Sequence, residues 1–599
     1  MVSSLRLGSD SFALPGCETI FIITDRGGFY KERNRIFVFF SKKNKKTLVD
    51  LYKKGRRKTL KMAKTISKIA NSLTKNVFSY KIILDTKKCE NEKQKRTGGT
   101  ELETKRLTRG AGILLAITSL PSSYGIGTLG DAAFQFIDLL VDLKQRYWQI
   151  LPVGPTGFGN SPYQSYSAFA GNPYLIDLDH LMKQGLLKEE EIRSFHWGKD
   201  ENGIDYAMIY ENRSQVLKMA FARFDREELG FLQFQEAEQE WLEDYGLYMA
   251  LKEQFGDREW QSWEIPLRDR YPEALEEYRQ RLKNEILFYK FCQYEFFKQW
   301  GFLKEYAQSS GIKLIGDMPF YIGADSADVW ANRELFLLNE DGTPKSVAAA
   351  PPDAFAGEGQ KWGCPVYNWQ RMEQDNFLWW QKRVAKQAQM CDVMRLDHFN
   401  AIVKYYTVPG EAENGKNGKW SKGPGRKFTD AVEKAAKDTK VIVENLGMKQ
   451  PLPGVRKLLA KTGWAGIKVL LFAFGDDTAN EHLPHNYTDS NLVVYAGTHD
   501  NDTIVGYFRD KTDYELAYLY EYLNIKYKEE IPDALIRAAY ASVADVAVIQ
   551  MQDLLKLGNE ARMNAPSTVG NNWRWRVGTD SLSEERRAWI RTLATVYRR

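Results

Sequence analysis

Carboxylates and other polar residues gather at the ends of four apolar runs in this 599-residue chain. The runs end at Gly316-Asp317, at Arg395-Leu396-Asp397-His398, at Glu444-Asn445 and at 498–502, which reads Thr-His-Asp-Asn-Asp. Two further polar clusters, 160–163 and 351–353, fall on predicted loops. A single carboxylate at a strand end usually caps the following helix. Four such clusters favour a shared catalytic site, because the carboxyl ends of barrel strands meet at one face.

The carboxylates of Asp397 and Glu444 suit different chemical roles. If 393–397 is a strand, its period of two places Arg395 and Asp397 on one face, and the cation keeps Asp397 ionised as a nucleophile requires. Glu444 follows three apolar residues at 441–443, and such surroundings raise a carboxyl pKa toward that of a general acid. Glycosidic bond cleavage requires such a pair, and a close pair gives retention through a covalent glycosyl-enzyme intermediate. The sequence alone does not fix the separation of the two groups.

From residue 110 onward, the elements that would position these residues alternate between apolar strands and amphipathic helices, as in βα units. The predicted strands are 112–117, 147–152, 313–317, 393–397, 440–444, 467–472 and 492–497. The predicted helices include 132–144, 284–308, 379–390 and 428–437. About seven βα units of this kind predict one large α/β barrel.

Two segments interrupt this alternation. Residues 178–282 are acidic, aromatic and helical in pattern, and we expect an inserted helical subdomain there. Residues 332–369 are irregular and rich in Gly, Pro and Ala, and we expect a long loop. In a barrel enzyme, loops that follow the strands make the substrate contacts.

The composition is that of a folded protein. Hydrophobic residues make up 43% and charged residues 27% of the chain, which excludes a disordered or fibrous protein. The net charge of +6 is unevenly distributed, because residues 1–106 carry 26 basic and 10 acidic side chains and residues 107–599 have a net charge of −10. We interpret 1–106 as a basic extension that is flexible or not native. A tail that binds nucleic acid or an anionic surface is the alternative.

Several partners and cofactors are not expected from the sequence. The five cysteines are irregularly spaced without a CxxC pair, which predicts a reduced, cytoplasmic protein. No apolar run reaches the ~20 residues that span a bilayer. His398 and His499 lack a third close ligand, and the loop 125–130 has no phosphate-binding motif, so we expect no metal and no nucleotide cofactor. The oligomeric state stays open.

Seven ordered blocks between residues 110 and 599 resemble a known family, the 4-α-glucanotransferases called amylomaltase or disproportionating enzyme, glycoside hydrolase family 77. The blocks are GILLAITSLPS (112–122) with YGIGTLG (124–130), PTGFGNSPYQSYSAFAGNP (155–173), GDMPFYI (316–322) with DSADVW (325–330), PPD (351–353) with GQKWGCPVYNW (359–369), RLDHF (395–399), ENLG (444–447) and GTHDND (497–502). The first 106 residues match nothing in the family.

The resemblance implies a (β/α)8 TIM barrel with inserted helical subdomains and long loops at the catalytic face. It implies retaining, double-displacement transfer of α-1,4-glucan segments between maltooligosaccharides or starch-type glucans, without a cofactor and without a nucleic-acid or membrane partner. By motif, Asp397 takes the nucleophile position, Glu444 that of the acid/base and Asp500 that of the transition-state stabiliser. The residues with implied substrate contacts are Arg395, His499, Asp317, Tyr163, Asp353, Trp362 and His398.

Two positions depart from the family pattern, since Asn445 and Asn368 stand where Asp is common. Neither belongs to the proposed catalytic trio. An α-glucan hydrolase of the amylase type would keep the same trio, whereas a non-catalytic glucan- or nucleic-acid-binding protein would not need it. We expect transfer to an acceptor sugar, with Trp362 and Tyr163 as candidate aromatic platforms for that sugar.

Overall fold

A computed structural model describes residues 106–599, except 353–355, 448–452 and 476, together with three short strands near the N-terminus. The chain divides into two compact units, 1–101 and 102–599. In the first unit, β1 (Thr19–Ile23), β2 (Ile36–Phe40) and β3 (Thr47–Asp50) form an antiparallel sheet that the sequence does not predict. Arg106 belongs to the second unit, where it pairs with Asp489 at 2.9 Å and Asp545 at 3.4 Å. The boundary therefore precedes Arg106.

Eight parallel strands close into a barrel in the second unit and follow one another around the ring in sequence order. They are β4 (Gly110–Leu114), β5 (Tyr147–Gln149), β6 (Lys313–Met318), β9 (Val393–Leu396), β12 (Lys440–Val443), β13 (Ala465–Val469), β14 (Leu492–Tyr495) and β15 (Val546–Gln550). Pairing of β15 with β4 completes the ring. The (β/α)8 barrel is thereby confirmed.

The strand β15 is the one barrel strand that the strand pattern of the sequence does not predict. Its first four residues are all apolar, and it runs directly into the short helix α19 (Met551–Leu554). A continuous apolar run that leads into a helix has no period that separates strand from helix. All five residues of β15 are buried, as expected for a strand with neighbours on both sides.

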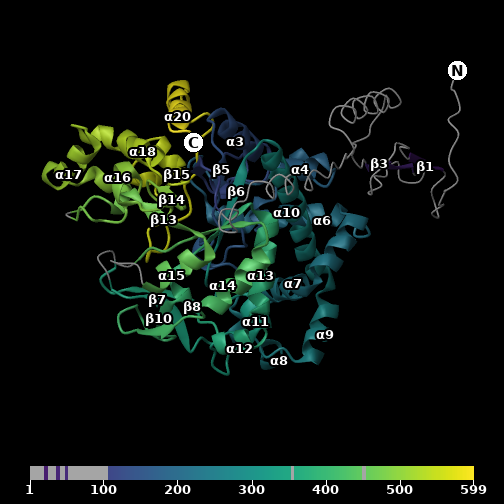
Figure 1. The fold of residues 1–599 in the computed structure, drawn as a ribbon. Coiled ribbons are helices and arrows are strands. Elements are labelled where there is room, and N and C mark those ends of the chain that lie inside the picture. Colours follow the sequence, from purple (N-terminus) through teal and green to yellow (C-terminus); the bar gives the residue numbers. More distant parts are fainter. Residues whose placement is uncertain are drawn as a thin grey trace, which may run out of the picture. The chain divides into compact units, whose positions relative to one another are not determined.

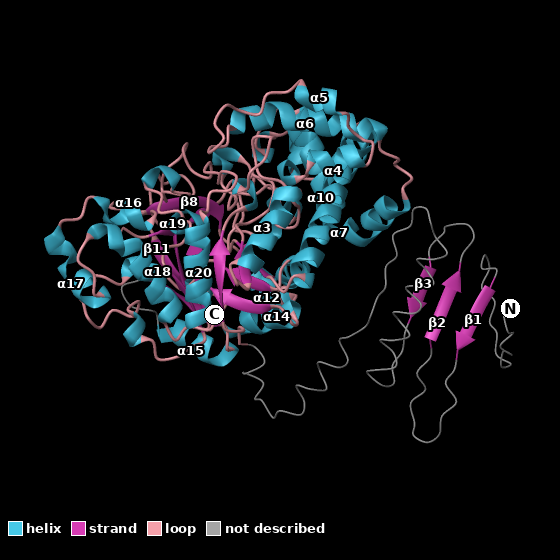
Figure 2. Ribbon diagram, turned by 90° about the horizontal axis from the view of Figure 1, so that it is seen from above, coloured by secondary structure: helices cyan, strands magenta, loops and turns pink. Residues whose placement is uncertain are grey.

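Helices surround the strands of the barrel (Figures 1 and 2). Four of them match predicted helices and are α3 (Asp131–Asp142), α10 (Lys283–Ser309), α13 (Leu378–Met390) and α14 (Arg426–Ala436). In α3, the buried residues Ala133, Phe136, Ile137 and Leu140 recur at helical spacing and form its inner face. Further helices of the C-terminal half are α15 (Pro453–Thr462), α16 (Ile504–Arg509), α17 (Asp513–Leu523), α18 (Ile531–Ala541) and α20 (Glu584–Val596).

The segment 178–282 is helical, in agreement with its sequence pattern. Its helices are α4 (Leu178–Lys183), α5 (Glu189–Arg193), α6 (Tyr206–Arg223), α7 (Leu229–Gln254), α8 (Ile265–Arg268) and α9 (Pro272–Arg281). The aromatic residues of this segment are used in packing, as where Trp241 of α7 meets Phe297 of α10 with ring centres 6.1 Å apart. In Figure 1, α6, α7 and α9 lie on the opposite side of the barrel from α16, α17 and α18.

Residues 332–369 are not the long loop that the sequence predicts. They contain β7 (Ser346–Ala350) and β8 (Gln360–Pro365), which join β10 (Lys404–Pro409) and β11 (Lys419–Lys422) in an antiparallel sheet of order β11-β10-β7-β8. The prediction is wrong because β7 is made of small residues and pairs with β10, more than fifty residues further along the chain. Local patterns do not reveal such a partner. The short helices α11 (Ala327–Ala331) and α12 (Trp369–Gln374) flank this segment.

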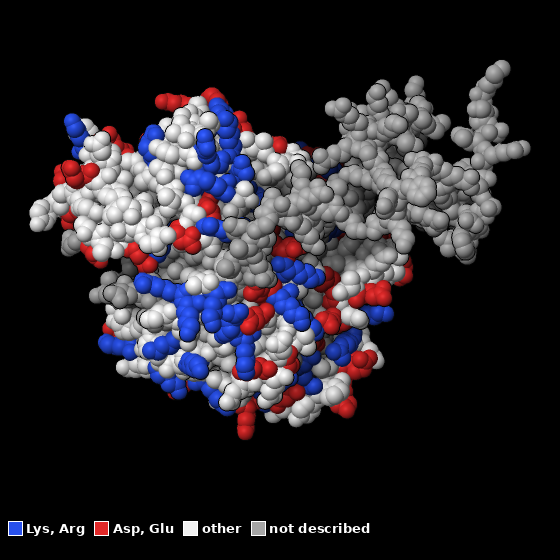
Figure 3. Space-filling model, viewed as in Figure 1, with Lys and Arg blue, Asp and Glu red and all other residues white. Residues whose placement is uncertain are grey.

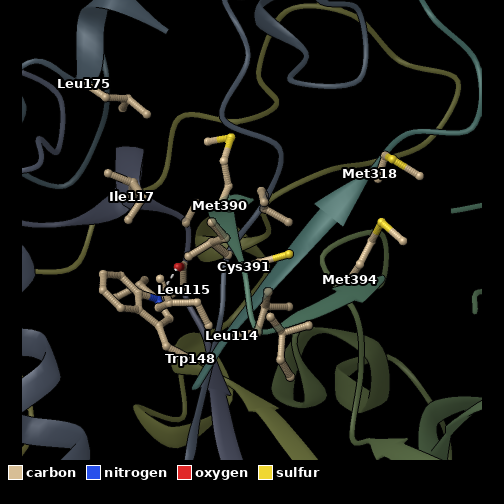
Figure 4. Close-up of a cluster of buried hydrophobic side chains, with 14 of the residues drawn as sticks. Leu114, Leu115, Ile117, Trp148, Leu175, Met318, Met390, Cys391 and Met394 are labelled. Carbon is tan, nitrogen blue, oxygen red and sulfur yellow. Dashed lines mark hydrogen bonds between the residues drawn. The ribbon is translucent and has the colours of Figure 1, made fainter. Parts of the chain in front are cut away.

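A cluster of apolar side chains fills the space between barrel strands and helices (Figure 4). Trp148 of β5 is fully buried there, beside Leu114 and Leu115. Its indole N–H donates a hydrogen bond to the carbonyl oxygen of Leu115 at 2.9 Å. Burial of a polar N–H is costly unless it finds such a partner. The bond therefore lets a large side chain join the core and ties β5 to the end of β4.

The visible surface of the second unit is charged, and none of its described helices has both the length and the apolar character that a bilayer requires. Figure 3 shows acidic and basic side chains side by side on the visible face of this unit. Among the residues described, no helix is both long and apolar enough to cross a bilayer. Nor do three or more His, Cys, Asp or Glu side chains come together as metal ligands in that part of the chain.

Gly112 on β4 has no room for a side chain. A Cβ atom there would lie 2.6 Å from the Cβ and 2.7 Å from the carbonyl oxygen of Tyr147 on β5. We expect Gly112→Ala to destabilise the barrel by about 1–3 kcal/mol, measured as a lower Tm in thermal unfolding. Gly301→Ala in α10 is the control, because nothing lies within 4 Å of a Cβ there, and its Tm should stay the same or rise. An unchanged Tm for Gly112→Ala would contradict this account.

Candidate active site

Four barrel strands deliver polar side chains to one end of the barrel. The residues are Asp317 in β6, Arg395 in β9 with Asp397 and His398 directly after it, Glu444 after β12, and His499 and Asp500 in the loop after β14. Parallel pairing sets their relative heights, because β6 places Asp317 opposite Arg395 and β12 places its last residue opposite the residue before Asp397. The structure therefore brings these predicted site residues together.

Arg395 binds carboxylates on two neighbouring strands. Its Nη1 donates to Oδ1 and Oδ2 of Asp317 at 2.7 and 2.8 Å and to Oδ1 of Asp397 at 2.9 Å. The side chains of Arg395 and Asp317 are 4% and 0% exposed. Burial raises the pKa of Asp317, while the charge of Arg395 opposes that rise. Arg395 and Asp397 are neighbours, as the period of the strand predicts.

Tyr163 connects the loop after β5 to this network. Its hydroxyl donates to Oδ2 of Asp317 at 2.8 Å and lies 2.8 Å from Nε2 of His499. A phenol has one proton, so with that proton given to Asp317 the Nε2 of His499 must be the donor in the second contact. The rings of Tyr163 and His499 stack, with centres 5.3 Å apart. Nδ1 of His499 is buried without a hydrogen-bond partner among the described residues.

The carboxyl group of Glu444 is held by backbone N–H groups on both sides. Oε2 accepts from His398 at 3.0 Å and Oε1 accepts from Leu446 at 2.6 Å. Burial raises the pKa of Glu444 to about 7, and the charge of Asp397 adds to the rise, although Arg395 and the two N–H groups oppose it. Glu444 therefore has a raised pKa, as its apolar surroundings in the sequence predict.

Asp500 lies in the loop between β14 and α16, with 46% of its side chain exposed. Its Oδ1 accepts from the side-chain amide of Asn564 at 2.7 Å, and its main-chain carbonyl oxygen accepts from Arg562 at 3.0 Å. Nε2 of His499 is 3.5 Å from Oδ2. The carboxylate is thus fixed by a contact at one oxygen and open to solvent elsewhere.

Trp362 on β8 brings the antiparallel sheet to the site. Its ring meets the ring of His398 edge-on, with centres 4.8 Å apart. Its carbonyl oxygen accepts from the side-chain amide of Gln164 at 2.8 Å, which ties β8 to the loop that carries Tyr163. Burial lowers the pKa of His398, so this imidazole is neutral near pH 7. Asp353, the remaining predicted site residue, lies outside the described residues.

Three residues near the C-terminus contact the site, and the sequence motifs do not predict them. Arg562 and Asn564 contact Asp500, and Trp573 packs against Tyr163 and His499 at ring distances of 5.8 and 6.0 Å. They follow the unpredicted strand β15, in a segment without helical or strand period. The available signal was the run of polar and aromatic residues after the last strand, since loops at that position face the catalytic end of a barrel.

The two departures from the family pattern keep their local hydrogen bonds. Oδ1 of Asn445 accepts from the N–H of Ile467 at 2.9 Å and ties β12 to β13. Oδ1 of Asn368 accepts from the N–H of Arg371 at 3.3 Å and caps α12. An aspartate oxygen would accept both bonds equally well. Asparagine therefore serves at both positions.

Comparison with known proteins identifies the family. A family model described as 4-alpha-glucanotransferase, that of glycoside hydrolase family 77, matches residues 115–581. This chain belongs to the 4-alpha-glucanotransferase family. The 4-alpha-glucanotransferase of Clostridium butyricum is 42% identical over 489 residues, which are 81% of this chain and 99% of the relative. The chloroplastic/amyloplastic 4-alpha-glucanotransferase of Solanum tuberosum is 40% identical over 503 residues, 81% of this chain and 86% of the relative.

A solved structure agrees with both fold and family. The amylomaltase of Streptococcus agalactiae in complex with acarbose superimposes with a TM-score of 0.79 at 40% identity and covers 82% of this chain and 99% of its own. The predicted family and activity are confirmed, and the chain is a 4-alpha-glucanotransferase. It transfers glucan segments.

Removal of the Arg395 cation should destabilise the protein. We expect Arg395→Met to cost about 3–5 kcal/mol, because the fully buried Asp317 loses its partner. Urea unfolding at pH 7 measures the change. The double variant Arg395→Met/Asp317→Leu also removes the buried carboxylate and should recover part of the loss. Wild-type stability of Arg395→Met would show that this contact does not hold the strand ends together.

Proposed function

We propose that Asp397, Glu444 and Asp500 carry out the glucan transfer of this enzyme. One observation carries the assignment of the reacting pair. The carboxyl group of Glu444 accepts a hydrogen bond from the N–H of His398, the residue next to Asp397, so the two carboxyl groups flank one peptide unit. Asp397 is bonded to a cation, whereas Glu444 is partly buried, with its pKa raised to about 7. Environments that separate the two groups in this way assign the nucleophile and the acid.

The first step forms a glycosyl-enzyme ester. Glu444 gives its proton to the glycosidic oxygen while an oxygen of Asp397 attacks the anomeric carbon. The bond between that carbon and the glycosidic oxygen breaks, and the reducing-end fragment leaves as an alcohol. The new ester bond to Asp397 inverts the anomeric centre. Arg395 loses one anionic partner in this step and keeps the other, Asp317.

In the second step, Glu444 acts as a base and Asp397 is released as a carboxylate. Once Asp397 is an ester, the negative charge that adds to the pKa of Glu444 is gone, and Glu444 stays ionised after it has given up its proton. It then takes a proton from an acceptor hydroxyl, whose oxygen attacks the anomeric carbon and releases Asp397. The second inversion restores the original configuration. The shared environment thus supports an acid in one step and a base in the next.

Asp500 and His499 are proposed to bind ring hydroxyls of the reacting sugar. The support for Asp500 is that about half of its side chain is exposed, and the support for His499 is its place beside that carboxylate, with Nε2 3.5 Å from Oδ2. Bonds that strengthen as the sugar approaches an oxocarbenium ion lower the barrier. Asp317 has no exposed surface, and we assign it the task of holding Arg395 and Tyr163 in place.

The proposed donors and acceptors are maltooligosaccharides and other α-1,4-glucans. The relatives named above support this choice. Transfer requires an acceptor sugar to outcompete water at the ester, and Trp362 beside His398 is the aromatic surface proposed to bind that sugar. Tyr163 contributes through its hydroxyl, which is bonded within the polar network. The surface charges of mixed sign in Figure 3 are compatible with an uncharged substrate.

We place the whole reaction in residues 107–599 and the enzyme in the cytoplasm. The first proposal is supported by the origin of the described site residues, which all come from the second unit. The second is supported by the thiols of that unit, because Cys292, Cys364 and Cys391 are buried and free. Reduced, inert thiols of this kind are typical of a reducing compartment.

Incubation with maltotriose tests the proposed reaction. We expect glucose and longer oligosaccharides without a net gain in reducing ends, because each cleaved bond is replaced by a new one. Asp397→Ala should lose activity by several orders of magnitude, while its far-ultraviolet circular dichroism stays that of the wild type. A steady rise in reducing ends would indicate a hydrolase instead. Wild-type activity of Asp397→Ala would refute its assignment as nucleophile.

The pKa of Glu444 sets the alkaline limit of the reaction. Since Glu444 must be protonated in the free enzyme for the first step, kcat/KM for maltotriose should fall above about pH 7 and approach a tenfold loss per pH unit. Maltosyl fluoride is the control donor, because fluoride leaves with little help from an acid, and formation of the ester from it should not show this limb. A flat maltotriose profile up to pH 9 would contradict the role of Glu444.

A further inference from the structure

The loop that carries Asp500 is held by a C-terminal segment, residues 562–564. The side-chain Nδ2 of Asn564 donates to Oδ1 of Asp500 at 2.7 Å, and its backbone N–H donates to the carbonyl oxygen of His499 at 3.1 Å. Nη2 of Arg562 donates to the carbonyl oxygen of Asp500 at 3.0 Å. Three hydrogen bonds therefore fix two consecutive residues of the loop, both in the side chain and in the main chain.

The segment 562–564 is itself held in place. Nε of Arg562 donates to the carbonyl oxygen of Asn564 at 2.8 Å, so one guanidinium group bridges the main chains of Asn564 and Asp500. Between them, Met563 is buried and its carbonyl oxygen accepts from the N–H of Trp573 at 2.7 Å. The ring of Trp573 in turn packs against His499. A support that is fixed at both ends can hold a side chain to within a few tenths of an ångström.

The three carboxylates of the trio are held by different kinds of partner, and that of Asp500 is held by this segment. Asp397 is bonded to a buried arginine, and Glu444 accepts two backbone N–H groups. Within 106–599, apart from its gaps, the one hydrogen bond described for the carboxylate of Asp500 comes from Asn564. Without that bond, the half-exposed side chain of Asp500 can rotate about χ1 and χ2, and water can take the position that its carboxylate occupied.

We propose that Asn564 and Arg562 are positioning residues for the transfer reaction. Asn564 holds the carboxylate of Asp500 in one orientation, and Arg562 fixes the main chain beneath it. This inference rests on the proposed role of Asp500. A misplacement of about 1 Å at a catalytic group can reduce the rate by a factor of 10². Because the interaction of Asp500 strengthens toward the transition state, its misplacement lowers kcat more than it changes KM.

The test compares two variants of one residue. Asn564→Ala removes the donor, and Asn564→Asp keeps the shape but places a like charge against Asp500. We expect kcat for maltotriose to fall about 10–100-fold in the first and further in the second, with KM within about threefold of the wild type. If Asn564→Ala lowers the Tm by more than a few degrees, Arg562→Met is measured instead. This variant removes the hydrogen bond to the carbonyl oxygen of Asp500, and the same fall in kcat with little change in KM is expected.

Asn559→Ala is the matched control. The amide of Asn559 donates to the carboxylate of Asp502, two residues from Asp500 on the same loop. It is the same kind of contact, but it does not involve Asp500. We expect wild-type kcat and KM for this variant. An equal loss of kcat in Asn559→Ala and Asn564→Ala would show that both act through general loosening of the loop, and would overturn the positioning role.

A double-variant cycle separates this inference from the function proposed for Asp500. With maltosyl fluoride as donor, the residual kcat of Asp500→Ala should not change further when Asn564→Ala is added, because the positioned group is gone. If the double variant instead loses kcat by the product of the two single-variant factors, the inference is overturned. Wild-type kcat of Asn564→Ala would overturn it as well. Wild-type kcat of Asp500→Ala would instead refute the stabilising role of Asp500. The two failures are therefore distinguishable.

Discussion

The contact of one buried guanidinium with two carboxylates governs the catalytic end of this barrel. Strand pairing places Asp317 of β6 opposite Arg395 of β9. Asp397 follows two residues after Arg395, directly beyond the end of β9. Two carboxylates brought together without a cation would repel each other and lose their hydration, at a cost of several kcal/mol per ion. Arg395 satisfies both and bonds only Oδ1 of Asp397. Its contact with that oxygen orients Asp397, while Oδ2 has no described hydrogen bond and is available for attack.

The same contact explains how two carboxyl groups in one pocket come to differ. Asp397 is paired with Arg395, and its side chain is 27% exposed. Glu444 lies one strand further from that cation and is partly buried, with its pKa raised to about 7. Neither residue type nor burial alone decides the roles. The division follows from the order of strands β6, β9 and β12 around the ring, because the cation stands between the first two.

The sequence predicted the parts of the structure that depend on local pattern. Arg395 and Asp397 share a face because a strand has a period of two, and Glu444 is recognisable at the end of an apolar run. The roles of Asp500 and His499 came from family motifs. Strands β7 and β15 were missed, the first because it is made of small residues and one of its two partners, β10, is distant, and the second because its first four residues are all apolar. Asn564 and Trp573 were missed for a related reason, since their partners in the site, Asp500 and His499, lie more than sixty residues away in the chain.

The strand that closes the barrel and the segment that completes the site are therefore consecutive in the chain. The last strand, β15, pairs with the first, β4, and the segment that fixes Asp500 follows directly after it. Before β15 is in place, Asp397 and Glu444 can already be set by their own strands, but Asp500 lacks the bond from Asn564 and His499 lacks the packing of Trp573. The proposed nucleophile and acid are thus held by neighbouring strands, whereas the proposed transition-state stabiliser, Asp500, also depends on a segment that follows β15, 62 to 64 residues further along the chain.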